Sequence, residues 1–152
     1  MMNHSMIRHI MTVCRVLCVF SVLSVIGSAA WAQTKSEKVF HAVAVDAKGI
    51  ETEVKNLTFY WEEKISETAF VPHELREVPV KRGTATVKIK FDSIKHIDLK
   101  ALGNGAPPNV TITLNDGKTG DFVLAIAGSF KGQSDFGEVE LPAAELKKLT
   151  FK

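Results

Sequence analysis

The amino-acid sequence predicts an all-β fold: a small β-sandwich or barrel-like domain with an internal two-fold pseudo-repeat, preceded by a signal peptide. Three observations predict it. Apolar residues alternate along many short segments, turn-forming residues separate these segments, and one strand–turn–strand segment occurs twice. No window sustains the apolar period of an α-helix, so we expect eight or nine short strands.

The duplicated segment is residues 87–99 (VKIKFDSIKHIDL), which falls on residues 139–151 (VELPAAELKKLTF) after a shift of 52 positions. Every apolar position is kept, and each copy reads as a strand, a tight turn and a second strand. The predicted turns are Asp92–Lys95 and Pro142–Glu145, with Asp92 expected to cap free backbone N–H groups. The pseudo-repeats are expected at about 47–99 and 100–152.

Two shorter matches extend this pattern. Phe70-Val71 falls on Phe122-Val123 at the same shift, and Asn56-Leu-Thr58 falls on Asn109-Val-Thr111 at a shift of 53 positions. A β-bulge would produce a difference of one residue. The alternative is that any two amphipathic strands joined by a turn look alike.

Residues 1–32 have the pattern of a signal peptide. Arg8 and Arg15 supply positive charge, the apolar run 16–26 is too short to span a bilayer comfortably, and small residues at Ala30 and Ala32 precede a cleavage site. A retained N-terminal anchor is the alternative. The expected organisation is a signal peptide cleaved after Ala32, a disordered leader at 33–38 and a single β domain at 39–152, located in the periplasm or secreted.

The mature chain is expected to be nearly neutral and free of cysteine. Removing Arg8 and Arg15 from the 19 basic residues leaves 17, against 17 acidic residues, so the charge gives no reason to expect nucleic-acid or anionic-membrane binding. Cys14 and Cys18 both lie in the signal peptide, which predicts a mature domain without disulfides. The remaining chain of about 120 residues is long enough to hold one core, burying roughly 65% of its unfolded surface.

In the first half, residues 39–45 and 51–61 show strand periodicity, separated by a turn at Asp46–Gly49. Residues 62–67 fit either a helical turn or a charged hairpin end. Pro72 and Pro79 exclude one regular central strand through residues 68–80. The segments expected to follow are a turn at Lys81–Gly83 and strands at 84–91 and 96–102.

In the second half, residues 103–108 read as a linker between the repeats. A strand is expected at Val110–Leu114, ending in the hairpin signal Asn115-Asp-Gly117. The apolar run Phe122–Ala127 predicts a buried strand, and Asp135-Phe-Gly137 predicts a turn. Short strands at 139–141 and 146–151 are expected to close the domain.

The last forty or so residues contain a series of turn and strand features: Asp116-Gly117, Gly132, Ser134-Asp-Phe-Gly137, Leu141-Pro142, Leu146-Lys147 and Leu149. In these features the segment resembles a short β module found in uncharacterised exported bacterial proteins. The resemblance implies a small barrel or sandwich architecture and brings no activity, cofactor or ligand with it.

Three histidines follow the signal peptide, and none lies in a metal-binding pattern. His41 falls on a valine-rich strand face, which is typical of a core or rim histidine. His73-Glu-Leu-Arg-Glu77 differs from the zinc motif His-Glu-x-x-His at its last position, because residue 77 is Glu. His96 aligns with Lys148 in the second repeat, which indicates an exposed face. We therefore expect no metal, cofactor or catalytic residue.

Other chemical motifs are incomplete. Gly117-Lys-Thr119 resembles the end of a phosphate loop, but Ile112 occupies the position of the first glycine. Asn115, Asp116 and Asp121 do not have the spacing of an EF-hand, and acids at hairpin ends are usually solvated. No Gly-x-Ser-x-Gly motif occurs.

The candidate partner contacts are Tyr60 and Trp61, within the aromatic run Phe59-Tyr60-Trp61. In a strand, Phe59 and Trp61 point to one face and Tyr60 to the other. We expect one face to lie against the core and Tyr60 to cover a sheet edge. The functional alternative is an exposed aromatic platform for a sugar, a peptide or a partner protein.

These observations predict a non-enzymatic exported interaction or structural module whose partner is a protein or an envelope polymer. The first alternative is a carrier of small apolar ligands, with a cavity between the halves lined by Phe122, Leu124 and Ile126. The second alternative is an enzyme that uses the scattered histidines and acids. Partner identity and oligomeric state do not follow from the sequence.

Overall fold

The computed structural model describes residues 38–103 and 106–152, and it confirms the all-β prediction. The predicted signal peptide and most of the leader lie outside the described residues. Eleven strands and two short 3-10 turns make up the fold, which is more strands than the sequence predicted. The elements are β1 (His41–Asp46), β2 (Glu51–Lys64), β3 (Phe70–Leu75), β4 (Glu77–Arg82), β5 (Ala85–Lys90), η1 (Phe91–Ser93), β6 (Ile94–Lys100), β7 (Asn109–Leu114), β8 (Thr119–Leu124), β9 (Ser129–Ser134), β10 (Gly137–Pro142), η2 (Ala143–Glu145) and β11 (Leu146–Phe151).

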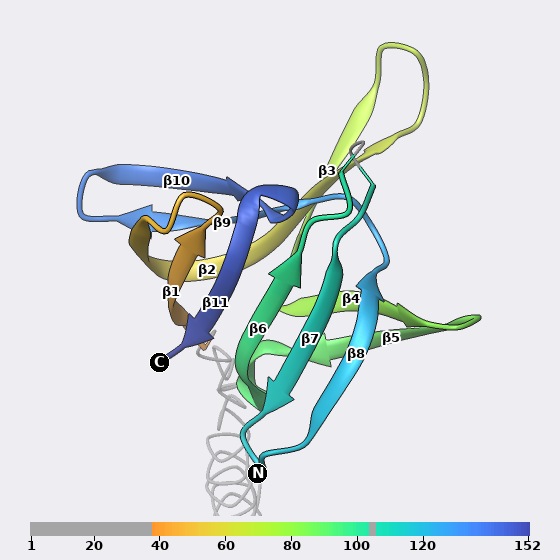
Figure 1. Ribbon diagram of the computed structural model, residues 1–152. Helices are drawn as coiled ribbons and strands as arrows, with labels where there is room; N and C mark the ends of the chain where they lie inside the picture. Colours follow the sequence, from red (N-terminus) through yellow and green to blue (C-terminus); the bar gives the residue numbers. More distant parts are fainter. Residues whose placement is uncertain (1–37, 104–105) are drawn as a thin grey trace, which may run out of the picture. The chain divides into compact units, whose positions relative to one another are not determined.

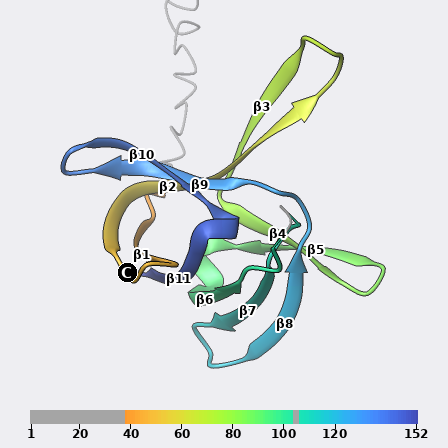
Figure 2. The same cartoon turned by 45° about the horizontal axis from the view of Figure 1, so that its top comes forward.

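All eleven strands belong to one antiparallel sheet. Ten of them follow the order β10-β9-β2-β1-β11-β6-β7-β8-β4-β5, and β3 pairs with β2 off this path. The sheet curls strongly, as Figures 1 and 2 show, but β10 and β5 do not pair with each other, so it does not close into a barrel. The barrel-like expectation is therefore met by a curled, open sheet.

One hydrophobic core fills the inside of the curled sheet. Its fully buried side chains come from strands near both ends of the strand order and from the centre, for example Phe130 in β9, Val80 in β4 and Ile97 in β6. Among the described residues, no polar or charged side chain is buried. The alternating burial along β1 and β7 follows the apolar alternation of the sequence, as a strand with one face against a core requires. In β6 and β11 the first two buried residues are three positions apart, next to irregularities in the pairing.

The strand order is symmetric about its centre. Counted inward from its two ends, the order matches β10 with β5, β9 with β4, β2 with β8, β1 with β7 and β11 with β6. With β3 left out, the strands β1 to β6 and their matches β7 to β11 also follow one another in the same order along the chain. The central strands pair with Leu149 opposite Ile97, two residues that are 52 positions apart. The pair His96–Thr150 then corresponds to the pair Asp98–Lys148 under the same shift.

The outer hairpins match in the same way. Glu77 pairs with Lys90 in β4–β5, and Ser129 pairs with Pro142 in β9–β10, again a shift of 52 positions. The β1–β2 and β7–β8 hairpins match at a shift of 68 positions, and both turns contain a glycine with positive φ, Gly49 and Gly117. The difference of 16 residues between the two shifts (68 − 52) is the chain that the first half adds between β2 and β4.

In this symmetric strand order β1 corresponds to β7, although β1 begins ahead of the predicted repeat start at residue 47. The pairings also show that the two shorter sequence matches are not equivalent positions. Asn56 lies inside β2, at an irregularity in its pairing with β9, whereas Asn109 begins β7 opposite Lys100. By the same pairings Phe122 corresponds to Val54, not to Phe70.

The duplicated turns are short 3-10 segments that begin with a buried residue, Phe91 in η1 and Ala143 in η2. The expectation that Asp92 caps η1 is wrong, because no side chain caps it. The backbone N–H of Asn115 instead donates to the carbonyl of Ser93, and the N–H of Ala47 donates equivalently to the carbonyl of Glu145. Each 3-10 segment is thus hydrogen-bonded to the hairpin turn beside it.

Segments 62–80 and 122–127 differ in detail from the sequence expectations. Residues 62–67 form a hairpin end, and residues 68–80 form two strands, β3 and β4, that break at Arg76. Pro79 is accommodated within β4, and its carbonyl accepts from the N–H of Ala125. The predicted buried strand Phe122–Ala127 ends at Leu124, because the chain bends there toward β9.

Candidate functional site

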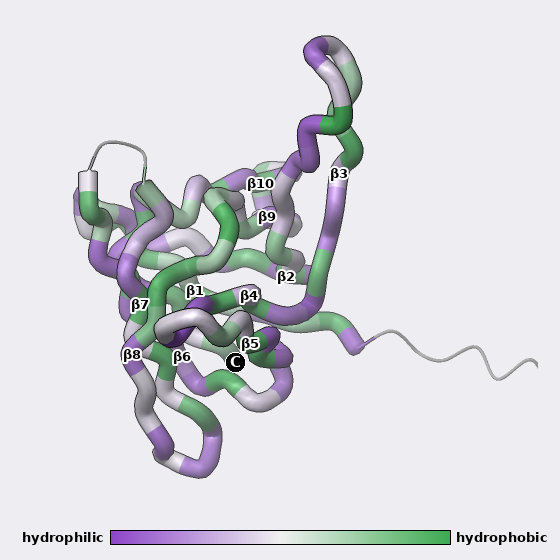
Figure 3. The backbone as a smooth tube through the Cα atoms, turned by 90° about the vertical axis from the view of Figure 1, so that its right-hand side faces the viewer, coloured by the Kyte–Doolittle hydropathy of each residue, from purple (hydrophilic) through white to green (hydrophobic). Residues whose placement is uncertain are grey.

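The most distinctive feature is the arm, residues 60–75, in which the end of β2 and β3 form a hairpin that extends away from the curled sheet (Figures 1 and 2). The arm pairs from Phe59–Leu75 to Lys64–Phe70. Ile65, Phe70 and Val71 on the arm are all exposed, with 66%, 52% and 37% of their surface in contact with solvent. Figure 3 shows hydrophobic stretches of the arm next to strongly hydrophilic ones.

Trp61 fixes the base of the arm. Its ring stacks on the ring of His73, with centroids 4.6 Å apart and an interplanar angle of 11°, and it also lies 6.1 Å from the buried ring of Phe59. His73 in turn lies 2.9 Å from a carboxylate oxygen of Glu63. Trp61 is half-buried and packs against the core, so it joins the arm to the domain and presents only part of its surface.

Tyr60 lies on the opposite face of β2, against β9 and β10. The ammonium group of Lys131 sits 3.3 Å from the centre of its ring, a cation–π contact, and the same ammonium pairs with Glu140 at 3.2 Å. The Tyr60 hydroxyl donates to Glu62 Oε1 at 2.5 Å. The sequence led us to expect that Tyr60 covers a sheet edge, but β2 is paired on both sides here, with Glu74 of β3 and Ser129 of β9.

These contacts change the protonation behaviour of both groups. The hydrogen bond to Glu62 holds the phenol in its neutral form and raises the pKa of Tyr60. Burial would lower the pKa of Lys131, but the hydrogen bond and charge of Glu140 outweigh it, and the net pKa is raised. Lys131 therefore stays cationic over Tyr60 at neutral pH.

We expect the alkaline absorbance titration of the protein to give a tyrosine midpoint above the ordinary value of about 10. The chain contains one tyrosine, so the signal reports Tyr60 alone. Glu62→Gln removes the charged acceptor and should lower the midpoint, whereas Glu63→Gln, whose carboxylate contacts His73, should leave it unchanged. An unshifted midpoint, or equal effects of the two variants, would contradict the assigned hydrogen bond.

A surface groove of about 410 Å³ lies where the arm meets β9 and β10, and we call it the arm groove. It is lined by Tyr60, Trp61, Glu62, Phe70, Ala127, Gly128, Ser129, Lys131 and Glu140. The groove brings both candidate contacts together with an exposed aromatic ring and three charged side chains. The arrangement offers aromatic surface and ionic hydrogen bonding but no nucleophile paired with a base.

The three histidines lie in separate places. His41 is half-buried in β1, His73 stacks on Trp61, and His96 lies 3.4 Å from Asp98 on the side of β6 away from the core. His96 is less exposed than the sequence indicated, with a quarter of its side chain accessible. Within residues 38–103 and 106–152, no three His, Cys, Asp or Glu side chains are grouped as a metal site requires.

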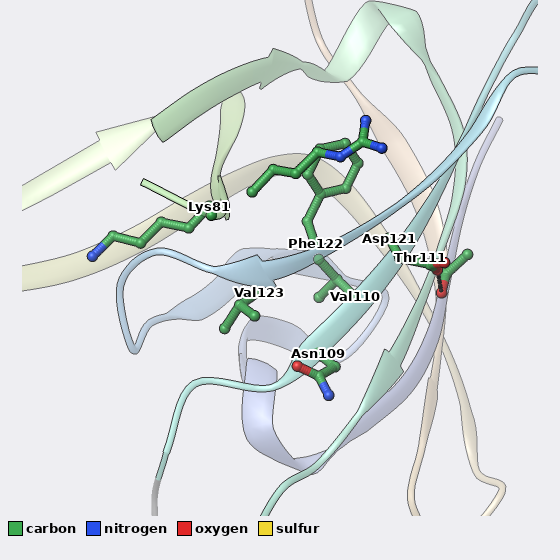
Figure 4. Close-up of a pocket in the computed structure, with 9 residues that line it drawn as sticks. Lys81, Asn109, Val110, Thr111, Asp121, Phe122 and Val123 are labelled. Carbon is green, nitrogen blue, oxygen red and sulfur yellow. Dashed lines mark hydrogen bonds between the residues drawn. The ribbon is translucent and has the colours of Figure 1, made fainter. Parts of the chain in front are cut away.

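A second cavity, of about 390 Å³, lies over β7 and β8 beside the end of β4. Figure 4 shows Thr111 and Asp121 side by side, with Phe122 and Val110 in the middle and Lys81 extending away from them. Thr111 Oγ1 donates to Asp121 at 2.7 Å. Phe122 lines this cavity, but Leu124 is buried in the core and Ile126 follows β8 in a bend. The cavity therefore does not combine the three residues proposed for an apolar carrier.

Comparison with known proteins gives one match. A protein-family model described as "Uncharacterised protein" matches residues 36–152. The chain belongs to this family. The matched range covers every strand of the curled sheet, including the arm. No curated protein and no solved structure matches the chain. Within the described ranges, no helix has the length and apolarity needed to cross a membrane.

Sequence reasoning identified Tyr60 and Trp61 but missed their partners. Lys131 and Glu140 reach Tyr60 only because β9 pairs with β2, across some seventy residues of chain. The structure marks this region by strand length: β2, with 14 residues, is the longest described strand, and its last three residues, Glu62–Lys64, are all exposed. A strand that is longer than its neighbours must extend beyond the sheet or pair with a further strand.

Proposed function

We propose that the protein is a non-enzymatic interaction module that docks its arm into a partner protein. The observation that carries this proposal is the arm itself: it projects from a domain with a complete core and exposes Ile65, Phe70 and Val71 to solvent. Large apolar side chains grouped on an element with little packing of its own are a common mark of a protein-binding surface.

The charge of the arm indicates the chemistry of the partner. The arm carries one lysine, Lys64, and four acidic side chains: Glu62, Glu63, Glu67 and Glu74. A complementary partner surface would have an apolar cleft for Phe70 and Ile65 and basic residues around it. Lys131 and Glu140 at the arm groove then fix the orientation of the arm base.

The edge of β3 favours side-chain contacts over addition of a strand. The N–H of Ile65 donates to the carbonyl of Ala69, so the alternation of the ladder turns the backbone groups of Phe70, Pro72 and Glu74 toward the open side. Pro72 has no N–H, which interrupts a new ladder at its middle. The partner is therefore expected to contact the side chains of the arm and not its backbone edge.

The proposal is tested by affinity capture from a native envelope extract, using the protein expressed from its full chain. We expect one protein to be retained by the wild type and lost with Phe70→Ser/Ile65→Ser. The matched control is Val123→Ser, an apolar residue on β8, outside the arm, that is 40% exposed. Capture that survives the arm variant, or that is lost equally with Val123→Ser, would refute docking through the arm.

Trp61→Ala is less discriminating, because Trp61 packs against the core and stacks on His73. It should weaken capture together with stability. A polysaccharide or a small apolar molecule recovered in place of a protein would replace the protein-partner proposal with an envelope-polymer or carrier function, respectively.

We also infer that the protein is exported and that its two halves are an internal repeat. Export is supported by the arginines, apolar run and small residues of segment 1–32, and N-terminal sequencing of the mature protein should begin at Gln33. The repeat is supported by the matching registers of the paired hairpins and by the pairing of Ile97 with Leu149.

A further inference from the structure

The two ends of the strand order are unpaired edges of opposite charge. β5 pairs with β4 alone and β10 pairs with β9 alone. The outward side chains of β5 include Lys88 and Lys90, whereas those of β10 include Glu138 and Glu140. These are corresponding strands of the two halves, so the same edge is basic in one half and acidic in the other.

The backbone groups that each edge offers follow from the hairpin geometry. Two residues lie between the closing pairs Arg82–Ala85 and Ser134–Gly137, and such closing pairs exchange both hydrogen bonds. Alternation then turns the N–H and C=O groups of Thr86, Lys88 and Lys90 toward the open side of β5. The carbonyl of Pro79, opposite Lys88, accepts from the N–H of Ala125, the residue that follows β8, which agrees with this assignment.

On β10 the same alternation turns Glu138, Glu140 and Pro142 outward. An antiparallel pairing of the two edges has one register that places Lys90 opposite Glu138 and Lys88 opposite Glu140. Both are opposite-charge pairs on the solvent face, and both are positions where the backbones exchange hydrogen bonds.

The other face of the same pairing is apolar. It places Val87, 39% exposed in β5, next to Leu141 of β10, and Ile89 next to Val139. Val139 and Leu141 already pack partly on the core of their own domain. The pairing would therefore extend the core side of the sheet as well as its solvent side.

The tip of the β9–β10 hairpin adds an anchor. Phe136 is fully exposed there, and the turn that presents it is held by two bonds: Phe136 N–H donates to Ser134 Oγ at 3.2 Å, and that hydroxyl donates to the Gly137 carbonyl at 3.0 Å. Continued by two residues, the register above brings Phe136 opposite Asp92. Asp92 lines a surface groove of about 420 Å³ that also includes Phe40, Leu75 and Lys90.

We propose that this protein assembles head to tail with copies of itself, the β10 edge of one copy pairing antiparallel with the β5 edge of the next. Phe136 of the first copy inserts into the groove at the end of β5 of the second. Because the two edges are different surfaces of the chain, the contact is heterologous and can propagate along a row of copies. A contact of two strand edges and one aromatic ring is small, so the assembly is weak and depends on concentration and salt.

The test is sedimentation velocity of the purified product of the full chain over a range of concentrations. We expect the weight-average mass of the wild type to rise with concentration and to fall when salt is added. Lys90→Glu and Glu138→Lys should each abolish the rise, and the variant with both changes should regain it. These two side chains are exposed, whereas Lys88 and Glu140 are left unchanged because they pair within the chain with Glu77 at 3.4 Å and with Lys131 at 3.2 Å. Unchanged circular dichroism verifies folding.

Two further variants test the geometry. Phe136→Ala should weaken the association, whereas Phe70→Ala, an exposed phenylalanine on the arm, should not. With Cys14 and Cys18 changed to Ser, Lys90→Cys/Glu138→Cys should form disulfide-linked ladders on mild oxidation, and Thr86→Cys/Glu138→Cys should not. A protein that stays monomeric at every concentration, or an association that neither charge reversal changes, would overturn the proposal. Either result would show that the charged edges only prevent strand pairing.

Discussion

Phe130→Ala is expected to lower the free energy of unfolding by about 3–5 kcal/mol, as the removal of a buried phenylalanine ring does in other cores. Phe130 is fully buried in β9, and its ring lies 5.4 Å from Phe59 in β2 and 6.5 Å from Phe91 in η1. The ring therefore connects the end of the strand order that contains β9 to the duplicated turn of the other half. Its loss leaves a cavity inside the curled sheet, between Phe59 and Phe91.

Urea unfolding followed by Trp61 fluorescence measures this effect, since Trp31, the second tryptophan of the chain, lies in the predicted signal peptide. The control is Phe136→Ala, which removes the same side chain from a fully exposed site and should change stability by less than about 0.5 kcal/mol at low protein concentration. Equal losses for the two variants would mean that the core is not arranged as described.

Gly132→Ala is expected to destabilise the domain by about 1–3 kcal/mol through overpacking. A Cβ atom at Gly132 would clash with Val54 Cγ1 and lie 2.6 Å from the carbonyl oxygen of Lys55. The second contact is with backbone, so a change of rotamer cannot relieve it. The residue that matches Gly132 at a shift of 52 positions is Val80 of β4, which is buried. The glycine is thus found where β9 meets the irregular part of β2 around Asn56.

The control for this variant is Gln133→Ala, a neighbouring change in the same strand at an exposed position. It should cost less than about 0.5 kcal/mol in the same urea experiment. Thermal unfolding should rank the variants in the same order. If Gly132→Ala were as stable as Gln133→Ala, the close approach of β2 and β9 would be wrong.

The local structure was largely predictable because it depends on neighbours in the chain. The alternation in Thr84–Phe91 predicts Val87, Ile89 and Phe91 inward. The structure buries Phe91 completely and Ile89 partly, but Val87 is 39% exposed because β5 is the end strand of the sheet. Gly49 and Gly117 are found at the turns that the sequence indicated, where positive φ favours glycine. Residues 87–99 and 139–151, which share an apolar pattern, each form a strand, a short 3-10 turn and a second strand.

The arm was not predictable from these signals. Residues 62–67 fit a helical turn or a hairpin end, and Pro72 and Pro79 obscured β3 and β4. A proline is compatible with a strand when its missing N–H would face away from the neighbouring strand, and pairing alone decides that. Local propensity carries no information about which side of a strand is paired.

The sequence by itself determined the all-β class and the positions of most turns, and Tyr60 and Trp61 were its candidate contacts. The tertiary structure decided the order of the strands, which interleaves the two halves so that β9 pairs with β2 and β4 pairs with β8. It also decided that Lys131 and Glu140 meet Tyr60, and that one open edge is basic and the other acidic. The physical reason is that strand pairing joins residues far apart in the chain, and the energy of such pairs depends on register and burial, which exist only once the sheet has formed.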